Sequence, residues 1–232
     1  MRTAAIITAR GGSKRIPRKN IKDFCGKPII AYSIEAALAA GVFDTVMVST
    51  DDEEIAGTAR QYGADIPFLR SEKTSNDYAV TSQVLAEVLE EYERRGEHYT
   101  NVCCIYPTAP FLTADRLKTA MELLEKTGAD SVLPVVQFSF PPQRSVALKD
   151  GYLKYIWPEH CNTRSQDLEP FYHDVGQFYC VNTTSFAVQK ALVMEKTVPL
   201  VMSEMEIQDI DTEEDWRLAE LKYRLLREKF EV

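Results

Sequence analysis

Short apolar runs alternate with longer amphipathic segments along this chain, and that alternation constrains the fold more than any other feature. The apolar runs have the length of single strands and occupy residues 4–8, 45–49, 102–106 and 131–136. Helical patterns lie between or after them, at residues 29–40, 52–62, 82–95 and 113–127. Strands that alternate with helices of this length indicate βαβ units. The sequence therefore predicts one Rossmann-like α/β domain over residues 1–232, with a mostly parallel sheet covered by helices on both faces.

Residues 137–175, here called the excursion, interrupt this rhythm. Asp150-Gly151 stands between two short strand-like stretches, which is the pattern of a β-hairpin, and aromatic side chains follow it. Such a segment is typical of a lid or a dimerisation arm, although a hairpin packed on its own subunit fits the same pattern. After the excursion the sequence predicts a strand at 177–181 and a last helix at 212–230, whose apolar stripe ends at Phe230.

A basic loop follows the first predicted strand. Residues 9–20 contain Gly11, Gly12 and Ser13 together with five basic residues and no acid. Adjacent glycines let backbone N–H groups approach an anion, and Arg and Lys suit an oligophosphate. Open α/β sheets bind ligands beyond the carboxyl ends of their strands, so the loop is predicted to hold a triphosphate rather than to be a solvated surface loop. Neither the Walker A pattern nor the Gly-x-Gly-x-x-Gly fingerprint is present.

The charge distribution narrows the class of partner. The chain has 27 Lys and Arg against 35 Asp and Glu, a net charge of −8, yet residues 10–22 hold six bases and no acid. A positive site on an acidic body favours small phosphorylated molecules and disfavours nucleic acid. No apolar run has the length of a membrane span, and no signal peptide is recognisable, so no membrane partner is expected. Five cysteines without metal-ligand spacing indicate reduced thiols in the cytoplasm.

Acidic residues gather just before the last predicted helix. Asp209-Ile210-Asp211 spaces two carboxylates by two residues, which places them on one face of an extended segment. Paired carboxylates suit Mg²⁺, which completes its shell with water and substrate phosphate. Asp211 could instead be a helix N-cap that forms a capping box with Glu214, and the residues leave both readings open. Asp51 and Asp52, at the end of the second strand, are more simply explained as an N-cap than as metal ligands.

Taken together, these stretches resemble the acylneuraminate cytidylyltransferase family over essentially the whole chain. The matching residues are A-R-G-G-S-K-R-I-P-R-K-N at 9–20, V-S-T-D-D at 48–52, Arg70 with Asp77 and Thr81, P-T-A-P at 107–110, and D-I-D-T-E-E-D at 209–215. The resemblance implies a fold of the nucleotide-diphospho-sugar transferase type. It also implies transfer of CMP from CTP to the anomeric hydroxyl of a nine-carbon ulosonic acid, with release of pyrophosphate.

Within that family, residues 172–179 (Y-H-D-V-G-Q-F-Y) resemble the pseudaminic acid branch. Val175 and Tyr106 depart from the residues that sialic acid enzymes commonly carry. Alternatives are N-acetylneuraminic or legionaminic acid as the acceptor, the eight-carbon acid Kdo, or a non-catalytic nucleotide-sugar sensor on the same fold.

The resemblance also implies roles for individual residues. The nucleotide would be bound by Arg10, Gly11, Gly12, Ser13, Lys14, Lys19, Asn20, Arg70, Asp77 and Thr81. The sugar would be bound by Tyr106, Arg144, His173, Gln177 and Tyr179. Arg10, Lys19, Asp209 and Asp211 would be catalytic, and the two aspartates would hold Mg²⁺. The expected assembly is a homodimer made by the excursion.

Overall fold

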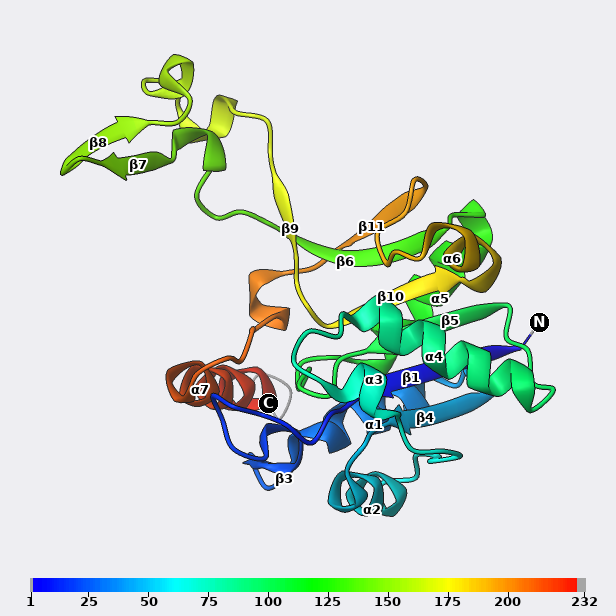
Figure 1. The fold of residues 1–232 in the computed structure, drawn as a ribbon. Coiled ribbons are helices and arrows are strands. Elements are labelled where there is room, and N and C mark those ends of the chain that lie inside the picture. Colours follow the sequence, from blue (N-terminus) through cyan, green and yellow to red (C-terminus); the bar gives the residue numbers. More distant parts are fainter. Residues whose placement is uncertain (1, 229–232) are drawn as a thin grey trace.

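A central, mostly parallel sheet organises the computed structural model, which describes residues 2–228 (Figure 1). Its strand order is β11-β6-β10-β5-β1-β4, with β9 on β6. The strands are β1 (Thr3–Thr8), β4 (Thr45–Ser49), β5 (Asn101–Ile105), β6 (Ser131–Gln137), β9 (Tyr172–Asp174), β10 (Phe178–Asn182) and β11 (Thr197–Val201). β1 runs parallel to β4 and β5, and β11 runs parallel to β6. β10 is antiparallel to both neighbours, β5 and β6.

Helices cover both faces of this sheet, as the alternation predicts. Alternate residues of β1 enter opposite cores: Ala5 and Ile7 pack with α1, α2 and α5, whereas Ala4 and Ile6 pack with α4 and α6. All four side chains are fully buried, because a strand in the middle of a two-faced layer has no solvent side. The helices are α1 (Ile29–Ala40), α2 (Glu53–Gln61), α3 (Glu72–Ser75), α4 (Thr81–Arg94), α5 (Ala114–Thr127) and α6 (Thr183–Gln189).

Local capping explains where these helices begin and end. The side chain of Asp52 accepts hydrogen bonds from the backbone N–H groups of Glu54 and Ile55, both at 3.0 Å, so the predicted cap is confirmed. Gly41 and Gly128 end α1 and α5 in the left-handed conformation that glycine adopts without strain. No helix in residues 2–228 is long and apolar enough to cross a membrane.

The excursion forms the predicted hairpin. Strands β7 (Val146–Lys149) and β8 (Tyr152–Tyr155) pair antiparallel around Asp150 and Gly151, which both have positive φ. Figure 1 shows this hairpin projecting away from the central sheet rather than packing on it, and β9 returns the chain to β6. Leu148 and Leu153 face each other across the hairpin and are 73% and 69% exposed.

The C-terminal helix α7 (Glu213–Glu228) packs on a third core cluster with the small hairpin of β2 (Asp23–Phe24) and β3 (Lys27–Pro28). Phe230, the predicted end of its apolar stripe, lies outside the described residues. Thr212 and Asp215 form the capping interaction: the Thr212 hydroxyl accepts the Asp215 N–H at 3.2 Å, and the Asp215 carboxylate accepts the Thr212 N–H at 2.8 Å. The sequence left two readings of Asp211 open, and the capping box with Glu214 is wrong: the cap forms one residue further on, without the Asp211 side chain.

Candidate active site

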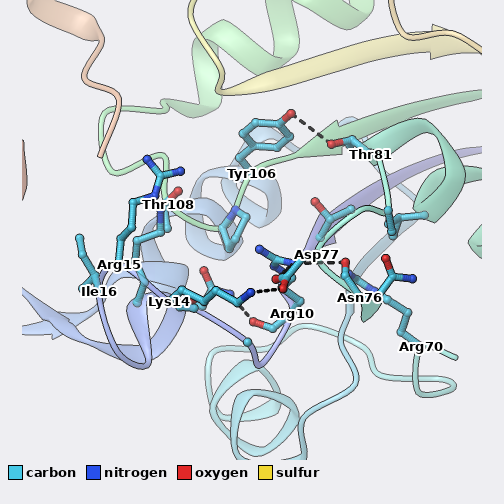
Figure 2. Close-up of a pocket in the computed structure, with 18 of the residues that line it drawn as sticks. Arg10, Lys14, Arg15, Ile16, Arg70, Asn76, Asp77, Thr81, Tyr106 and Thr108 are labelled. Atoms are coloured by element: carbon cyan, nitrogen blue, oxygen red, sulfur yellow. Dashed lines mark hydrogen bonds and ion pairs between the residues drawn. The ribbon is translucent and has the colours of Figure 1, made fainter. Parts of the chain in front are cut away.

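The carboxyl ends of β1 and β5 open onto a cavity of about 490 Å³ (Figure 2). Parallel strands end at the same edge of a sheet, so the loops that follow them converge there. The basic loop after β1 forms one wall, and the segment from Arg70 to Thr81 forms a second. Tyr106, Pro107 and Thr108 follow β5, and Asp211 enters from the segment before α7.

Gly11 and Gly12 have different roles in the basic loop. A Cβ at Gly11 would lie 2.8 Å from the Oδ2 of Asp52, so this position admits only glycine without displacing the helix cap. The Gly11 N–H donates to the carboxylate of Asp51 at 2.9 Å, and Gly11 does not line the cavity. Gly12 lines the cavity, and no atom lies within 4 Å of where its Cβ would be. Gly11 therefore fixes the loop on the strand end, and Gly12 leaves room for a ligand.

Asn20 and Arg18 also hold the loop in place. The side chain of Asn20 is 5% exposed, and its Nδ2 donates to the backbone carbonyl of Arg10 at 2.9 Å. Arg18 has a left-handed φ of 54°, and its guanidinium bridges Asp52 and Glu54. The hydrogen bonds from Arg18, the largest effect, lower the pKa of Asp52 to about 2.

The other basic residues of the loop face the cavity in two groups. Arg10 and Lys14 both contact the carboxylate of Asp77, with the Arg10 contact at 2.9 Å. Arg15 and Lys19 approach Asp211 at 2.7 Å and 3.7 Å. The Lys19 Nζ also donates to the backbone carbonyl of Ile210 at 2.7 Å, which ties the loop to the acidic segment. The concentration of positive charge predicted from the sequence is therefore present at the cavity wall. Ser13 lines the cavity among these residues.

Arg70 supplies a buried cation at the inner end of the cavity. It is 8% exposed, and its guanidinium donates to the side chain and backbone of Ser49, at the end of β4. Burial lowers the pKa of Arg70, because the charged form loses hydration. The hydroxyls of Thr81 and Tyr106, which line the same cavity, lie 3.2 Å apart. These groups present hydrogen-bonding atoms with fixed geometry, as recognition of a nucleobase and ribose requires.

Only part of the predicted sugar set reaches this cavity. Tyr106 lines it, and its ring lies 5.6 Å from that of Tyr179. Tyr179 and Gln177 are buried, with 6% and 2% of their surface exposed. Gln177 holds the backbone of Tyr106, whose N–H donates to the Gln177 carbonyl at 2.8 Å. Burial, followed by the hydrogen bond to Asp174, raises the pKa of Tyr179 well above its ordinary value. Gln177 Nε2 donates to the carbonyl of Glu206, while its buried Oε1 has no partner among the described residues.

His173, Asp209 and Arg144 lie elsewhere. His173 and Asp209 line a separate cavity of about 310 Å³ between the end of β6 and the segment before α7. Arg144 belongs to the excursion, where its guanidinium lies 6.0 Å from the Phe140 ring and 3.4 Å from the Ser165 hydroxyl. Neither Arg144 nor His173 lines the nucleotide-sized cavity of its own chain.

The acidic segment keeps both carboxylates outside the core. Ile210 is 2% exposed and packs with Trp216, so Asp209 and Asp211 flank a buried residue in an extended stretch. Asp211 reaches the first cavity and Asp209 the second. In residues 2–228 no group of three or more His, Cys, Asp or Glu side chains gathers closely enough to bind a metal ion by itself. A cation held by one of these carboxylates would complete its shell with water or with phosphate oxygens.

Some lining residues carry no distinctive sequence signal. Thr8, Asn76 and Thr108 line the cavity beside the predicted residues.

Arg116 of α5 forms an ion pair with Glu206 through two hydrogen bonds, both at 2.8 Å, which anchors the segment that leads to Asp209. Arg116 and Glu206 are 90 residues apart in the chain, and only their meeting in the fold identifies them.

Comparison with solved structures identifies the fold. The structure of CMP:2-keto-3-deoxy-manno-octonic acid synthetase complexed with CTP covers 98% of this chain and 100% of its own, with a TM-score of 0.69 at 17% identity. The 4-diphosphocytidyl-2C-methyl-D-erythritol synthase of Anaerococcus prevotii covers 96% of this chain and 98% of its own, with a TM-score of 0.65 at 14% identity. The fold is that of the nucleotide-sugar transferases, as predicted.

Sequence comparison identifies the family. A family model described as Cytidylyltransferase matches residues 4–157. The chain is 41% identical to the pseudaminic acid cytidylyltransferase of Campylobacter jejuni serotype O:2, over 98% of this chain and 99% of the relative. It is 35% identical to the CMP-N,N'-diacetyllegionaminic acid synthase of Legionella pneumophila, over 98% and 99%. The chain belongs to the cytidylyltransferase family, which confirms the resemblance found in the sequence.

Proposed function

We propose that this enzyme transfers CMP from CTP to the anomeric hydroxyl of a nine-carbon ulosonic acid and releases pyrophosphate, with pseudaminic acid as the preferred acceptor. The observation that carries the proposal is the cavity at the carboxyl edge of the sheet, where a cationic loop faces the buried Arg70 and the Thr81–Tyr106 pair. The relatives named as pseudaminic acid cytidylyltransferases, at 41% and 40% identity, support the acceptor. The structural neighbour complexed with CTP supports the nucleotide.

The arrangement suits an in-line displacement at phosphorus. Arg70 and Thr81 would fix the cytidine, and Gly12, Ser13 and the basic side chains of the loop would hold the triphosphate. Lys19, which is already directed toward the acidic segment, would face the α-phosphate. Charge grows on the transferring and leaving oxygens, so positioning and electrostatic stabilisation would supply most of the rate.

We propose that Asp211 binds Mg²⁺ together with Asp209, which would have to turn toward it from the separate cavity that it lines in this structure. Their carboxylates are hard oxygen ligands, and Asp211 reaches the cavity where phosphate oxygens would complete the shell. When bound, Mg²⁺ would offset negative charge on the phosphates. Arg15 and Lys19, which contact Asp211 in this structure, would then be free to contact phosphate.

The acceptor would bind beside Tyr106, over the layer formed by Gln177 and Tyr179. His173, in the neighbouring cavity, would contact the same sugar from the β9 side. Arg144 remains our candidate for the sugar carboxylate. It stands on the projecting excursion and lines neither cavity of its own chain, so we propose that it contacts the sugar in a partner's site. This placement supports a dimer in which the excursion closes on the second subunit.

The exposed apolar surface of the excursion supports that dimer. Leu148, Tyr152 and Leu153 are between 69% and 74% exposed, far more than a core-forming hairpin would allow. Burial of this surface against a second copy would remove it from water, and a stable interface of this kind covers more than about 1,000 Å². We also propose that the enzyme works in the cytoplasm, since all five cysteines are free thiols.

An acceptor panel tests the function. Pyrophosphate release is measured with CTP, Mg²⁺ and, in turn, pseudaminic, legionaminic and N-acetylneuraminic acids. We expect pseudaminic acid to give the highest kcat/KM, with N-acetylneuraminic acid at least about a hundredfold lower, because unpaired buried polar groups discriminate strongly. Preference for legionaminic acid, the sugar in the name of the Legionella relative, would change the acceptor alone. No CMP transfer to any of the three would refute the function.

A further inference from the structure

Among the described residues, two acidic side chains line the cavity. Asp211 comes from the segment before α7, and Asp77 comes from the turn between α3 and α4. The Asp77 carboxylate contacts Arg10 through Oδ1 and Lys14 through Oδ2, so each oxygen holds one cation (Figure 2). These are two of the four basic side chains with which the loop faces the cavity. A carboxylate held between two cations occupies the place that a phosphate group would take.

The surroundings of Asp77 do not explain it as a structural residue. Its side chain is 38% exposed, and the following residues Tyr78 and Val80 are 92% and 56% exposed. The Asn76 carbonyl also accepts from Arg10, at 3.2 Å. The turn between α3 and α4, residues 76–80, is therefore fixed mainly by its contacts with the basic loop. Little apolar surface would be exposed if the turn moved.

We propose that Asp77 is an internal counter-ion of the phosphate site, which sets its affinity for polyphosphate. In the nucleotide-free enzyme the Asp77 carboxylate neutralises Arg10 and Lys14. The incoming triphosphate, with greater charge, displaces it, and the carboxylate returns when pyrophosphate leaves. This inference rests on the proposed function and assigns to Asp77 a role other than the cytidine contact that the family resemblance implies.

The physical consequence is a lower affinity for every phosphate ligand, including the product. Each polyphosphate must break two partly exposed ion pairs before it gains its own contacts. Solvent screens partly exposed pairs of this kind and makes each one weak, so the two together correspond to about a tenfold change in affinity. Ligands without phosphate break neither pair, and their affinity should not depend on Asp77.

The test measures how Asp77→Asn binds two kinds of ligand: polyphosphates, which lack a base, and cytidine, which lacks phosphate. Asparagine keeps the size of the side chain and removes its charge. We expect inorganic pyrophosphate and tripolyphosphate to bind about tenfold more tightly to the variant in calorimetry at low salt, and cytidine to bind as it does to the unaltered enzyme. Asp77→Glu, which keeps the charge, should restore the weaker pyrophosphate binding. In steady state, Asp77→Asn should show stronger inhibition by pyrophosphate.

Glu97→Gln is the matched control, because Glu97 pairs with Arg2 at 3.0 Å with similar exposure, at the opposite end of β1. It should leave pyrophosphate binding unchanged. Unchanged pyrophosphate binding in a folded Asp77→Asn variant would overturn the proposal, and weaker cytidine binding in that variant would return Asp77 to a base-reading role. The calorimetric measurements need neither acceptor nor turnover, so their failure is distinct from failure of the proposed CMP transfer.

Discussion

Lys19→Ala should lower kcat about a hundredfold while changing CTP binding much less. The Lys19 side chain is 22% exposed, and its Nζ lies 2.7 Å from the Ile210 carbonyl and 3.7 Å from Asp211. It is therefore fixed beside the acidic segment before the substrate binds. Loss of one prepositioned donor to a developing oxyanion costs on the order of 10²–10³ in turnover, or about 3 kcal/mol.

The assay compares initial rates of pyrophosphate release with the calorimetric affinity for CTP. An interaction made mainly in the transition state lowers kcat and kcat/KM together. Lys22→Ala is the matched control, since Lys22 pairs with Glu213 at 2.7 Å and lies outside the cavity lining. Thermal unfolding separates the catalytic loss from the loss of the Ile210 contact. A folded Lys19→Ala variant with unchanged kcat would refute the reasoning.

Three further predictions address the metal, the helix cap and the assembly. Asp209→Asn and Asp211→Asn should each raise the Mg²⁺ concentration needed for half-maximal turnover without loss of thermal stability; equal Mg²⁺ curves would exclude these residues as ligands. Asp52→Ala should lower the free energy of unfolding by about 1–2 kcal/mol in denaturant titration at neutral pH, and a loss under about 0.3 kcal/mol would contradict the capping role. Because the pKa of Asp52 is held near 2 in the folded state, its contribution is complete above about pH 4 and is lost as pH falls through 2, so the difference between the two proteins should shrink in that window. Leu148→Asn combined with Leu153→Asn should convert a dimer into a monomer in sedimentation at micromolar concentration, and an unaltered enzyme that is already monomeric would contradict the dimer.

The strands and helices of the sheet follow from local pattern and are placed well by the sequence. The predicted helix at 29–40 coincides with α1, and the predicted strand at 45–49 coincides with β4. Both are set by short-range rules: continuous apolar runs for strands buried on two faces, and a glycine where a helix ends. The register error at Asp211, where Thr212 is the cap, has the same origin, because several adjacent residues can cap and only the backbone path selects one.

Chain order and residue type by themselves determined the α/β class, the cytidylyltransferase family and the cationic loop at the end of β1. These depend on local periodicity and on a contiguous motif, and both can be recognised in the sequence without knowledge of the fold. Tertiary structure alone decided which charges meet: Asp77 with Arg10, and Lys19 with the segment before α7, nearly 200 residues away. It also decided that Arg144 stands away from its own cavity. Coulomb and hydrogen-bond energies depend on distances of a few ångströms between residues far apart in the chain, and no sequence spacing fixes those distances.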